Sequence, residues 1–147
     1  MIEKTLSRIL IVEDNENDIE LTMDALSEHN LTNHIDIAKD GEEALDYLYR
    51  REIYSARENV NPILIILDLK LPKITGLEVL KIIKKDPGLF SIPVVILTSS
   101  KEESDLIKGY QYGVNAYVVK PVEFHKFIDA VKQLGVFWVF INEPPVN

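Results

Sequence analysis

Five short apolar runs, most of them rich in Ile and Val, recur along the chain at intervals that leave room for a helix between neighbours. Most are continuous rather than alternating in polarity, which is typical of strands in a sheet that is covered on both faces. The runs occupy residues 9–12, 34–38, 63–67, 94–97 and 116–119. The sequence therefore predicts a strand–helix unit repeated five times.

The stretches between these runs carry helical signals. Ile19, Met23 and Leu26 form an apolar stripe at spacings of four and three, and similar stripes follow the later runs. Three capping boxes place a capping side chain three residues before a Glu, at Asp40–Glu43, Thr75–Glu78 and Ser100–Glu103. The fourth helix is marked by Leu106, Tyr110 and Gly113, and the fifth by Phe124, Phe127, Ile128, Val131 and Leu134.

Strands and helices in this alternation predict an α/β fold. Right-handed crossovers would give a doubly wound parallel sheet of five strands with helices on both faces. In such a sheet the functional site lies at the carboxyl ends of the strands. Residues 51–61 are polar and long for a connection, and we expect a surface loop there with room for a turn of helix. The length fits one domain, residues 1–147.

The charge balance and the absence of cysteine exclude several classes of function. The chain has 24 acidic against 16 basic residues and a net charge of -8, which disfavours binding to nucleic acid or to an anionic membrane. With Cys 0 there is no thiolate nucleophile, disulfide or cysteine-ligated metal. No signal peptide is apparent, and no apolar run approaches the ~18 residues of a membrane span. We therefore expect a cytoplasmic protein.

Polar residues follow four of the predicted strands at the point where each strand ends. They are Glu13 and Asp14 after the first, Asp68 after the third, Thr98 at the fourth and Lys120 after the fifth. A single acid in such a place is usually a solvated turn or a helix cap. Together, however, these groups would meet at one edge of a parallel sheet and form one site.

Three clustered carboxylates raise one another's pKa unless a cation lies among them. Oxygen-only ligands suit Mg²⁺, and a bound ion would leave Asp68 ionised as a nucleophile. Attack of a carboxylate on a phosphoryl group gives an acyl phosphate. The three equatorial oxygens of that group would then be stabilised by Mg²⁺, Lys120 and Thr98.

The motifs at these strand ends resemble those of the receiver domain of two-component response regulators, which has a flavodoxin-like (βα)5 fold. The matching elements are Glu13–Asp14, Asp68-Leu-Lys-Leu-Pro72, Thr98–Ser99 and Tyr117-x-x-Lys120-Pro121. They occur in order on the expected strand ends, and the resemblance covers roughly residues 8–133.

The resemblance implies a role for each of these residues. Asp68 would be the phosphoacceptor and a ligand of Mg²⁺. Asp14 and the backbone carbonyl of Lys70 would bind the ion directly, and Glu13 would bind it through a water. The family is a signalling receiver that catalyses only its own phosphotransfer and slow dephosphorylation, so we expect no separate enzymatic activity.

The resemblance also implies a conformational switch. Lys120, followed by a cis peptide bond to Pro121, would pair with the phosphoryl group. Thr98 would move toward that group, and Tyr117 would rotate inward behind it. The position of this aromatic ring would report the charge at Asp68.

The end of the chain suggests how the signal leaves the receiver. Residues 136–147 are too few for a DNA-binding module and are predicted to extend the fifth helix as an apolar segment. Because this segment is apolar all round, we expect it to form a homodimer interface. The residues expected in that interface are Val136, Phe137, Trp138 and Phe140. In the alternative, Gly135 turns the tail back onto its own domain.

The long loop and the aromatic-rich tail make the chain similar to the small response regulators that pair with bacterial and cyanobacterial phytochromes. That similarity implies a phosphohistidine on a light-sensing histidine kinase as the donor and an unknown downstream protein as the target.

Two other interpretations stay open at this stage. A flavin-binding flavodoxin-like protein would need a phosphate-cradling loop where Glu13–Glu16 stands, and these acids would repel a phosphate without a metal. A metal-dependent phosphatase with an aspartate nucleophile usually has a second acid two residues later, whereas Lys70 occupies that position.

Overall fold

A computed structural model describes residues 8–27, 34–99 and 116–134. Its elements in chain order are β1 (Arg8–Val12), α1 (Glu16–Ser27), β2 (His34–Ala38), α2 (Gly41–Tyr49), the 3₁₀ helix η2 (Glu52–Tyr54), β3 (Leu64–Asp68), α3 (Gly76–Lys85), β4 (Val94–Thr98), β5 (Ala116–Val119) and α5 (Phe124–Leu134). The fourth predicted helix and the predicted extension at residues 136–147 lie outside the described residues. Within those described, no helix is both long enough and apolar enough to cross a membrane.

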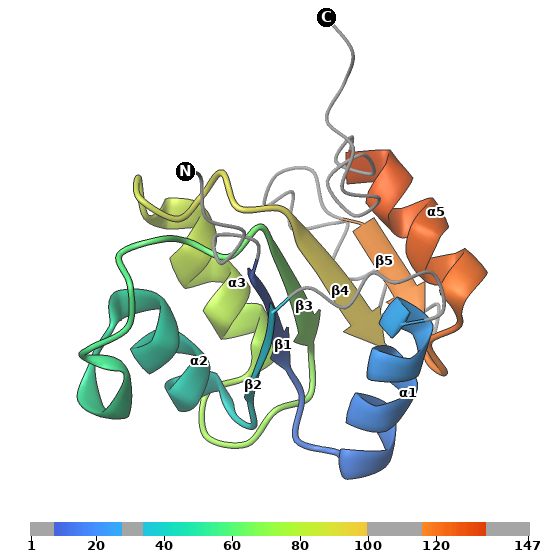
Figure 1. The fold of residues 1–147 in the computed structure, drawn as a ribbon, viewed down its shortest axis with the longest axis horizontal. Coiled ribbons are helices and arrows are strands. Elements are labelled where there is room, and N and C mark those ends of the chain that lie inside the picture. Colours follow the sequence, from blue (N-terminus) through green and yellow to red (C-terminus); the bar gives the residue numbers. More distant parts are fainter. Residues whose placement is uncertain (1–7, 28–33, 100–115, 135–147) are drawn as a thin grey trace, which may run out of the picture.

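The strands of the described residues form one parallel sheet in the order β2-β1-β3-β4-β5 (Figure 1). β1 pairs with both β2 and β3, so the chain winds outward in two directions from the centre of the sheet. This arrangement confirms the predicted doubly wound α/β fold. The reversal of strand order at β1 and β3 is the topological switch point, where such sheets place their sites.

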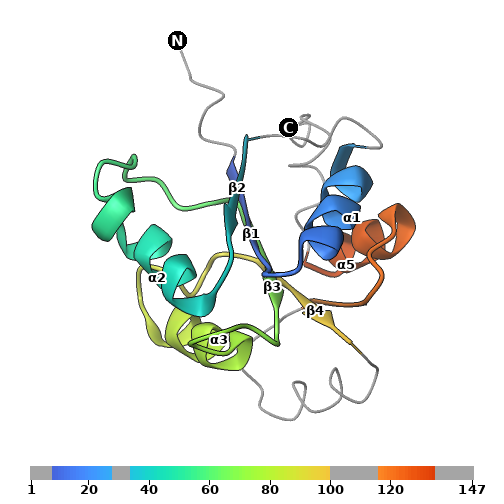
Figure 2. The same ribbon diagram turned by 90° about the horizontal axis from the view of Figure 1, so that it is seen from below.

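Helices cover both faces of this sheet (Figure 2). α2 and α3 cover one face, where Leu10, Val12, Ile65 and Leu67 belong to a single buried cluster. α1 and α5 cover the other face, where the intervening strand residues pack with the buried side chains of these helices. Because both faces are covered, every residue of β3 and β4 is buried, as the continuous apolar runs predict.

The first helical stripe needs a correction. Ile19 and Leu26 are buried as expected, but Met23 is 36% exposed, and Thr22 is buried instead. The hydroxyl of Thr22 donates a hydrogen bond to the carbonyl of Asp18 at 2.8 Å, which satisfies this polar group inside the core.

The helix caps follow the prediction with one difference. Thr75 Oγ1 accepts from the backbone N–H of Glu78, and the Glu78 carboxylate accepts from the backbone N–H of Thr75, so α3 begins with a complete capping box. At α2 the side chain of Asp40 accepts from the N–H of Glu43 at 2.7 Å. The Glu43 carboxylate accepts from the N–H of Lys39, one residue before the expected donor. The third predicted box, Ser100–Glu103, lies outside the described residues.

The polar segment 51–61 is an ordered connection that contains η2, in agreement with the expected turn of helix. Arg57 holds it to the domain. The Arg57 guanidinium lies 4.0 Å from the centre of the Tyr47 ring, and it donates to the carbonyls of Tyr47 at 3.0 Å and Val60 at 2.9 Å. The connection leads to Ile63, whose N–H donates to the carbonyl of Arg8. The end of the connection therefore lies at the amino ends of β1 and β3.

Candidate functional site

The carboxyl ends of four parallel strands bring together the polar residues that the sequence singles out. Glu13 directly follows β1, Asp68 and Thr98 end β3 and β4, and Lys120 directly follows β5. These residues are deeply placed, since Glu13 and Thr98 are 0% exposed and Asp68 is 3% exposed. The structure therefore gathers the predicted groups at one edge of the sheet.

Glu13, Asp14 and Asp68 form a compact acidic cluster. Each offers one carboxylate oxygen, and these oxygens all lie within 4.8 Å of one another. Asp14 is exposed, while the other two are buried. Three oxygens at this separation, open to solvent through Asp14, fit a hard divalent cation such as Mg²⁺ or Mn²⁺.

Lys120 provides a positive charge beside these acids. Its ammonium nitrogen lies 3.1 Å from Glu13 Oε1, 3.3 Å from Asp68 Oδ2 and 2.9 Å from Asp18 Oδ2. The Lys120–Pro121 peptide bond is cis, as the resemblance implies. One ammonium thus contacts carboxylates from β3, α1 and the turn that joins β1 to α1.

The electrostatics follow from burial and from these contacts. Burial and, after it, the charge of Asp68 raise the pKa of Glu13, and although Lys120 opposes both effects, the net result is a pKa of about 7. Burial alone lowers the pKa of Lys120, but its hydrogen bond to Asp18 and the charges of Asp68 and Glu13 outweigh that effect and raise the pKa. Lys120 is therefore held in its charged form.

The turn after β3 is packed tightly around Asp68. The backbone N–H of Lys70 lies 3.4 Å from Asp68 Oδ1 and donates to it. Gly76 donates from its N–H to the carbonyl of Leu69 at 2.9 Å. A Cβ at Gly76 would lie 2.1 Å from the carbonyl oxygen of Asp68, so this helix start requires glycine. The backbone of the site is thereby fixed on both sides of Lys70.

The two predicted switch residues lie on β4 and β5. Thr98 is fully buried, and its hydroxyl oxygen has no hydrogen-bond partner within the described part of the chain. Tyr117 is half-buried and packs against the cluster under α2 and α3. Burial raises the pKa of the Tyr117 hydroxyl. The buried hydroxyl of Thr98, which has no partner in the described structure, is available to hydrogen-bond a group that binds beside Asp68.

Sequence reasoning missed Asp18. This residue contacts Lys120 across 102 positions of the chain, and no pattern in the sequence fixes that contact. A weaker signal was present, because Asp18 lies four residues after Asp14, about one helical turn, which keeps it near the same end of the sheet. The predicted dimer residues at 136–140 lie outside the described part of the structure.

Three comparisons identify the class of protein. The family model for the response regulator receiver domain matches residues 9–132. Response regulator Rcp1 of Synechocystis sp. is 37% identical over 131 residues, covering 89% of this chain and 88% of Rcp1. The structure of the bacteriophytochrome response regulator RtBRR is 55% identical with a TM-score of 0.88, and the match covers 95% of this chain and 84% of that chain. The chain therefore belongs to the response regulator receiver domain family.

Membership of this family makes the chain a two-component signalling protein whose partner is a histidine kinase. Phytochrome response regulators are among its relatives. The structure of the Mn(2+)-bound form of Rcp1 is 34% identical with a TM-score of 0.72, over 96% of this chain and 99% of that chain. Receiver domains bind a divalent metal through their acidic cluster, and the cluster found here fits one. The flavin-binding and phosphatase interpretations are set aside.

Proposed function

We propose that the protein accepts a phosphoryl group on Asp68 from a phosphohistidine of its kinase and passes the signal on through protein contacts. The observation that carries this proposal is the placement of Asp68. Its carboxylate is almost fully buried, 3.3 Å from the ammonium of Lys120 and within 4.8 Å of carboxylate oxygens of Glu13 and Asp14. A carboxylate held in position beside an ammonium group can act as a nucleophile.

In the reaction, an oxygen of Asp68 attacks the phosphorus atom of the donor. The phosphorus–nitrogen bond to the donor imidazole breaks, and its electron pair leaves with the ring nitrogen. Lys120 lies close enough to Asp68 to bind a phosphoryl oxygen once the group is transferred. The product is an aspartyl phosphate, which adds negative charge to a site that already holds several carboxylates.

The acidic cluster is proposed to hold Mg²⁺ through Asp14 and Asp68 directly, through Glu13 by way of a water, and through the Lys70 carbonyl. When bound, the ion neutralises charge that develops on the transferring group. Within the protein, the N–H of Lys70 and the contact of Gly76 with the Asp68 carbonyl keep the nucleophile in place.

Thr98 and Tyr117 are proposed to read the state of Asp68. Thr98 is the last residue of β4, the strand next to β3, and its hydroxyl has no hydrogen-bond partner in the described structure. This hydroxyl would gain a hydrogen bond by moving toward the phosphoryl group. Tyr117 pairs with Ile96 on the adjacent strand, so movement of β4 at Thr98 would alter the space available to the ring.

The remaining proposals concern the setting of the protein. We infer that residues 1–147 act as a single receiver without an activity beyond their own phosphotransfer and slow dephosphorylation. Similarity to RtBRR and Rcp1 supports a phytochrome kinase in the cytoplasm as the donor. Residues 136–147 are proposed to extend α5, and Val136, Phe137, Trp138 and Phe140 to form a homodimer interface. The downstream target is proposed to be a protein.

Labelling with radioactive acetyl phosphate and Mg²⁺ tests the central proposal. We expect acid-stable, base-labile label on the unsubstituted protein and none on Asp68→Asn. Asp24→Asn is the matched control, because it removes an exposed carboxylate on α1 outside the site, and it should label normally. Equal label on Asp68→Asn and the unsubstituted protein would rule out Asp68 as the acceptor.

A further inference from the structure

The shortest contact of the Lys120 ammonium is with Asp18, a residue to which neither the sequence motifs nor the proposed phosphotransfer assigns a role. The nitrogen lies 2.9 Å from Asp18 Oδ2, against 3.1 Å to Glu13 and 3.3 Å to Asp68. Both side chains are largely buried, at 18% exposure for Lys120 and 22% for Asp18. Partial burial makes this charged hydrogen bond stronger than one on an open surface.

Asp18 is held firmly in the first turn of α1. Its N–H donates to the side chain of Asn15 at 2.9 Å, which caps the helix. Its carbonyl accepts from the buried hydroxyl of Thr22 at 2.8 Å. Since the backbone is fixed on both sides, the carboxylate reaches Lys120 from a rigid element rather than from a loop.

The three carboxylates around Lys120 differ in what they can do. Glu13 and Asp68 belong to the acidic cluster that fits a divalent cation, whereas Asp18 is not part of that cluster. A cation held by Glu13 and Asp68 would repel the nearby ammonium. Asp18 offers that ammonium a partner outside the cluster.

We propose that Asp18 is a positioning residue that holds the ammonium of Lys120 on the α1 side of the site until a phosphoryl group reaches Asp68. This inference rests on the proposed function. With a divalent cation in the acidic cluster, Asp18 would keep the ammonium bound on the α1 side, away from Glu13 and Asp68, which it also contacts in this structure. After phosphotransfer it competes with the phosphoryl oxygens for the same ammonium, so it favours metal binding and opposes the phosphorylated state.

The first experiment measures the affinity for beryllofluoride, a phosphoryl mimic, at saturating Mg²⁺. Asp18→Asn keeps the shape of the side chain but removes its charge, so the ammonium is released for the mimic. We expect the affinity to rise about two- to fivefold, the range for a partly exposed ion pair. Asp18→Glu, which restores the charge, should return the affinity toward that of the unsubstituted protein.

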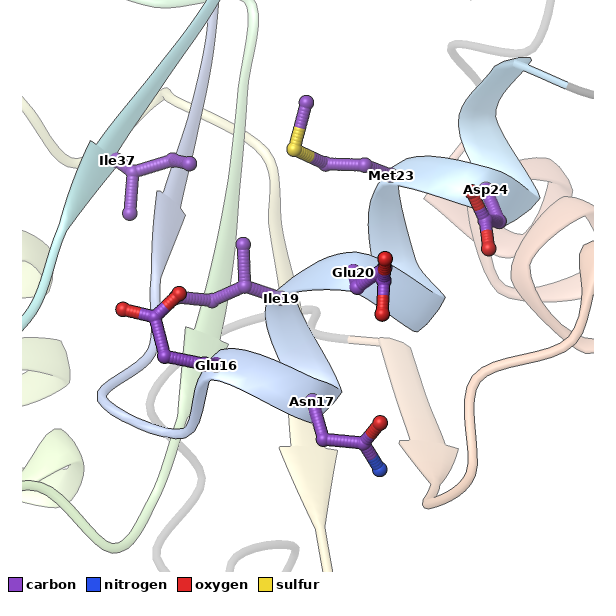
Figure 3. A pocket seen from close by; sticks show the side chains of 7 residues that line it. All are labelled: Glu16, Asn17, Ile19, Glu20, Met23, Asp24 and Ile37. Carbon is purple, nitrogen blue, oxygen red and sulfur yellow. The ribbon is translucent and has the colours of Figure 1, made fainter.

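Glu20→Gln is the matched control for loss of one negative charge from α1. Glu20 is exposed and lines a separate groove of about 670 Å³ between α1 and β2, where Met23 points toward Ile37 (Figure 3). We expect its effect on beryllofluoride affinity to be well below that of Asp18→Asn. Equal effects of the two variants would mean that Asp18 acts only through its general field, and the proposal would be overturned.

A double-mutant cycle tests whether Asp18 acts through Lys120. Without Asp18 the ammonium stays with Glu13 and Asp68 and competes with Mg²⁺, so Asp18→Asn should lower Mg²⁺ affinity about threefold. In a Lys120→Ala background the same replacement should have a clearly smaller effect. An undiminished effect in that background overturns the proposal.

The same titrations separate this proposal from the one on which it rests. If the unsubstituted protein bound neither Mg²⁺ nor beryllofluoride, both proposals would fall. If it bound both ligands normally and Asp18→Asn bound them with unchanged affinities, the proposal for Asp18 alone would fall.

Discussion

Gly76, the first residue of α3, lies directly against the main-chain carbonyl of Asp68. A Cβ on Gly76 would stand 2.1 Å from that carbonyl oxygen and 2.6 Å from the Cα of Leu69. Both neighbours are backbone atoms, which cannot move aside as the end of a side chain could. The start of α3 and the position of the nucleophile are therefore set together.

Gly76→Ala should damage both stability and metal binding. The added methyl group must displace either α3 or the end of β3, and overpacking of this kind lowers the free energy of unfolding by about 1–3 kcal/mol. Because Asp68 is displaced, Mg²⁺ affinity should fall as well. Urea denaturation and calorimetric titration measure the two effects. Gly88→Ala is the control, since its nearest contact would be a side-chain oxygen of Asp86 at 3.3 Å, and metal affinity should be unchanged.

Thr98→Val should separate stability from switching. The Thr98 hydroxyl is buried without a hydrogen-bond partner in the described structure, so its replacement by a methyl group should raise the free energy of unfolding by up to about 1 kcal/mol. Beryllofluoride affinity should fall at the same time. Thr22→Val, which removes a hydrogen bond to Asp18, should instead destabilise the protein. An unchanged beryllofluoride affinity in Thr98→Val would contradict the role proposed for Thr98.

Mg²⁺ should raise the thermal midpoint of unfolding through the acidic cluster. A ligand that binds only the folded state at one hundred times its dissociation constant adds about 2.7 kcal/mol. Asp14→Asn should abolish this increase. It should leave the metal-free protein at least as stable, because an exposed carboxylate that repels its neighbours is lost. A full Mg²⁺ response in Asp14→Asn would show that the ion binds elsewhere.

The pKa of Asp86 should depend on Tyr49. The Tyr49 hydroxyl donates to Asp86 at 2.5 Å and the N–H of Gly88 donates at 2.7 Å, and these bonds lower the pKa of the carboxyl. Since the folded pKa lies below the unfolded one, the stabilisation is present above the unfolded pKa and is lost as pH falls through the folded value. Tyr49→Phe should raise the pKa measured by NMR. An unchanged value would mean that the Gly88 bond alone lowers it.

Arg57→Ala should destabilise the domain without changing the site. The variant loses the stacking on Tyr47 and two hydrogen bonds to carbonyls, which together contribute about 1–2 kcal/mol. Glu58→Ala, at an exposed position of the same segment, should change the free energy of unfolding by less than about 0.5 kcal/mol. Mg²⁺ affinity should be the same in both variants.

Much of this architecture could be predicted because it depends on local pattern. β3 and β4 are apolar throughout, and such strands indicate a sheet covered on both faces. Once the sheet is parallel, residues that follow strands must share an edge, so Asp68, Thr98 and Lys120 could be placed together before any distance was known. The resemblance to receiver domains then implied the individual roles of these residues, such as phosphoacceptor and switch residue, which their chemistry alone left open.

The burial of Met23 was predicted wrongly and the contact of Asp18 with Lys120 was not predicted, each for a physical reason. Met23 lies on the apolar stripe of α1, but it faces Ile37 of the edge strand β2 (Figure 3), beyond which no strand of the described structure extends the sheet to cover it. The spacing of apolar residues in a helix predicts which side chains face the sheet, but it does not predict where the sheet ends and leaves such a side chain partly exposed. Likewise, the contact of Asp18 with Lys120 depends on how closely α1 and the end of β5 approach, which is a tertiary distance that no short pattern encodes.

The segment at residues 51–61 leads to the amino end of β3, whereas Asp68 is the last residue of the same strand. The last residues of this segment are separated from the metal ligands by the length of the buried strand β3. The exposed residues Glu58 and Asn59 therefore offer a place for a fluorescent label or an inserted tag. A label or tag attached there should leave the geometry of the phosphorylation site unchanged, so that the protein can be immobilised or detected while it is phosphorylated.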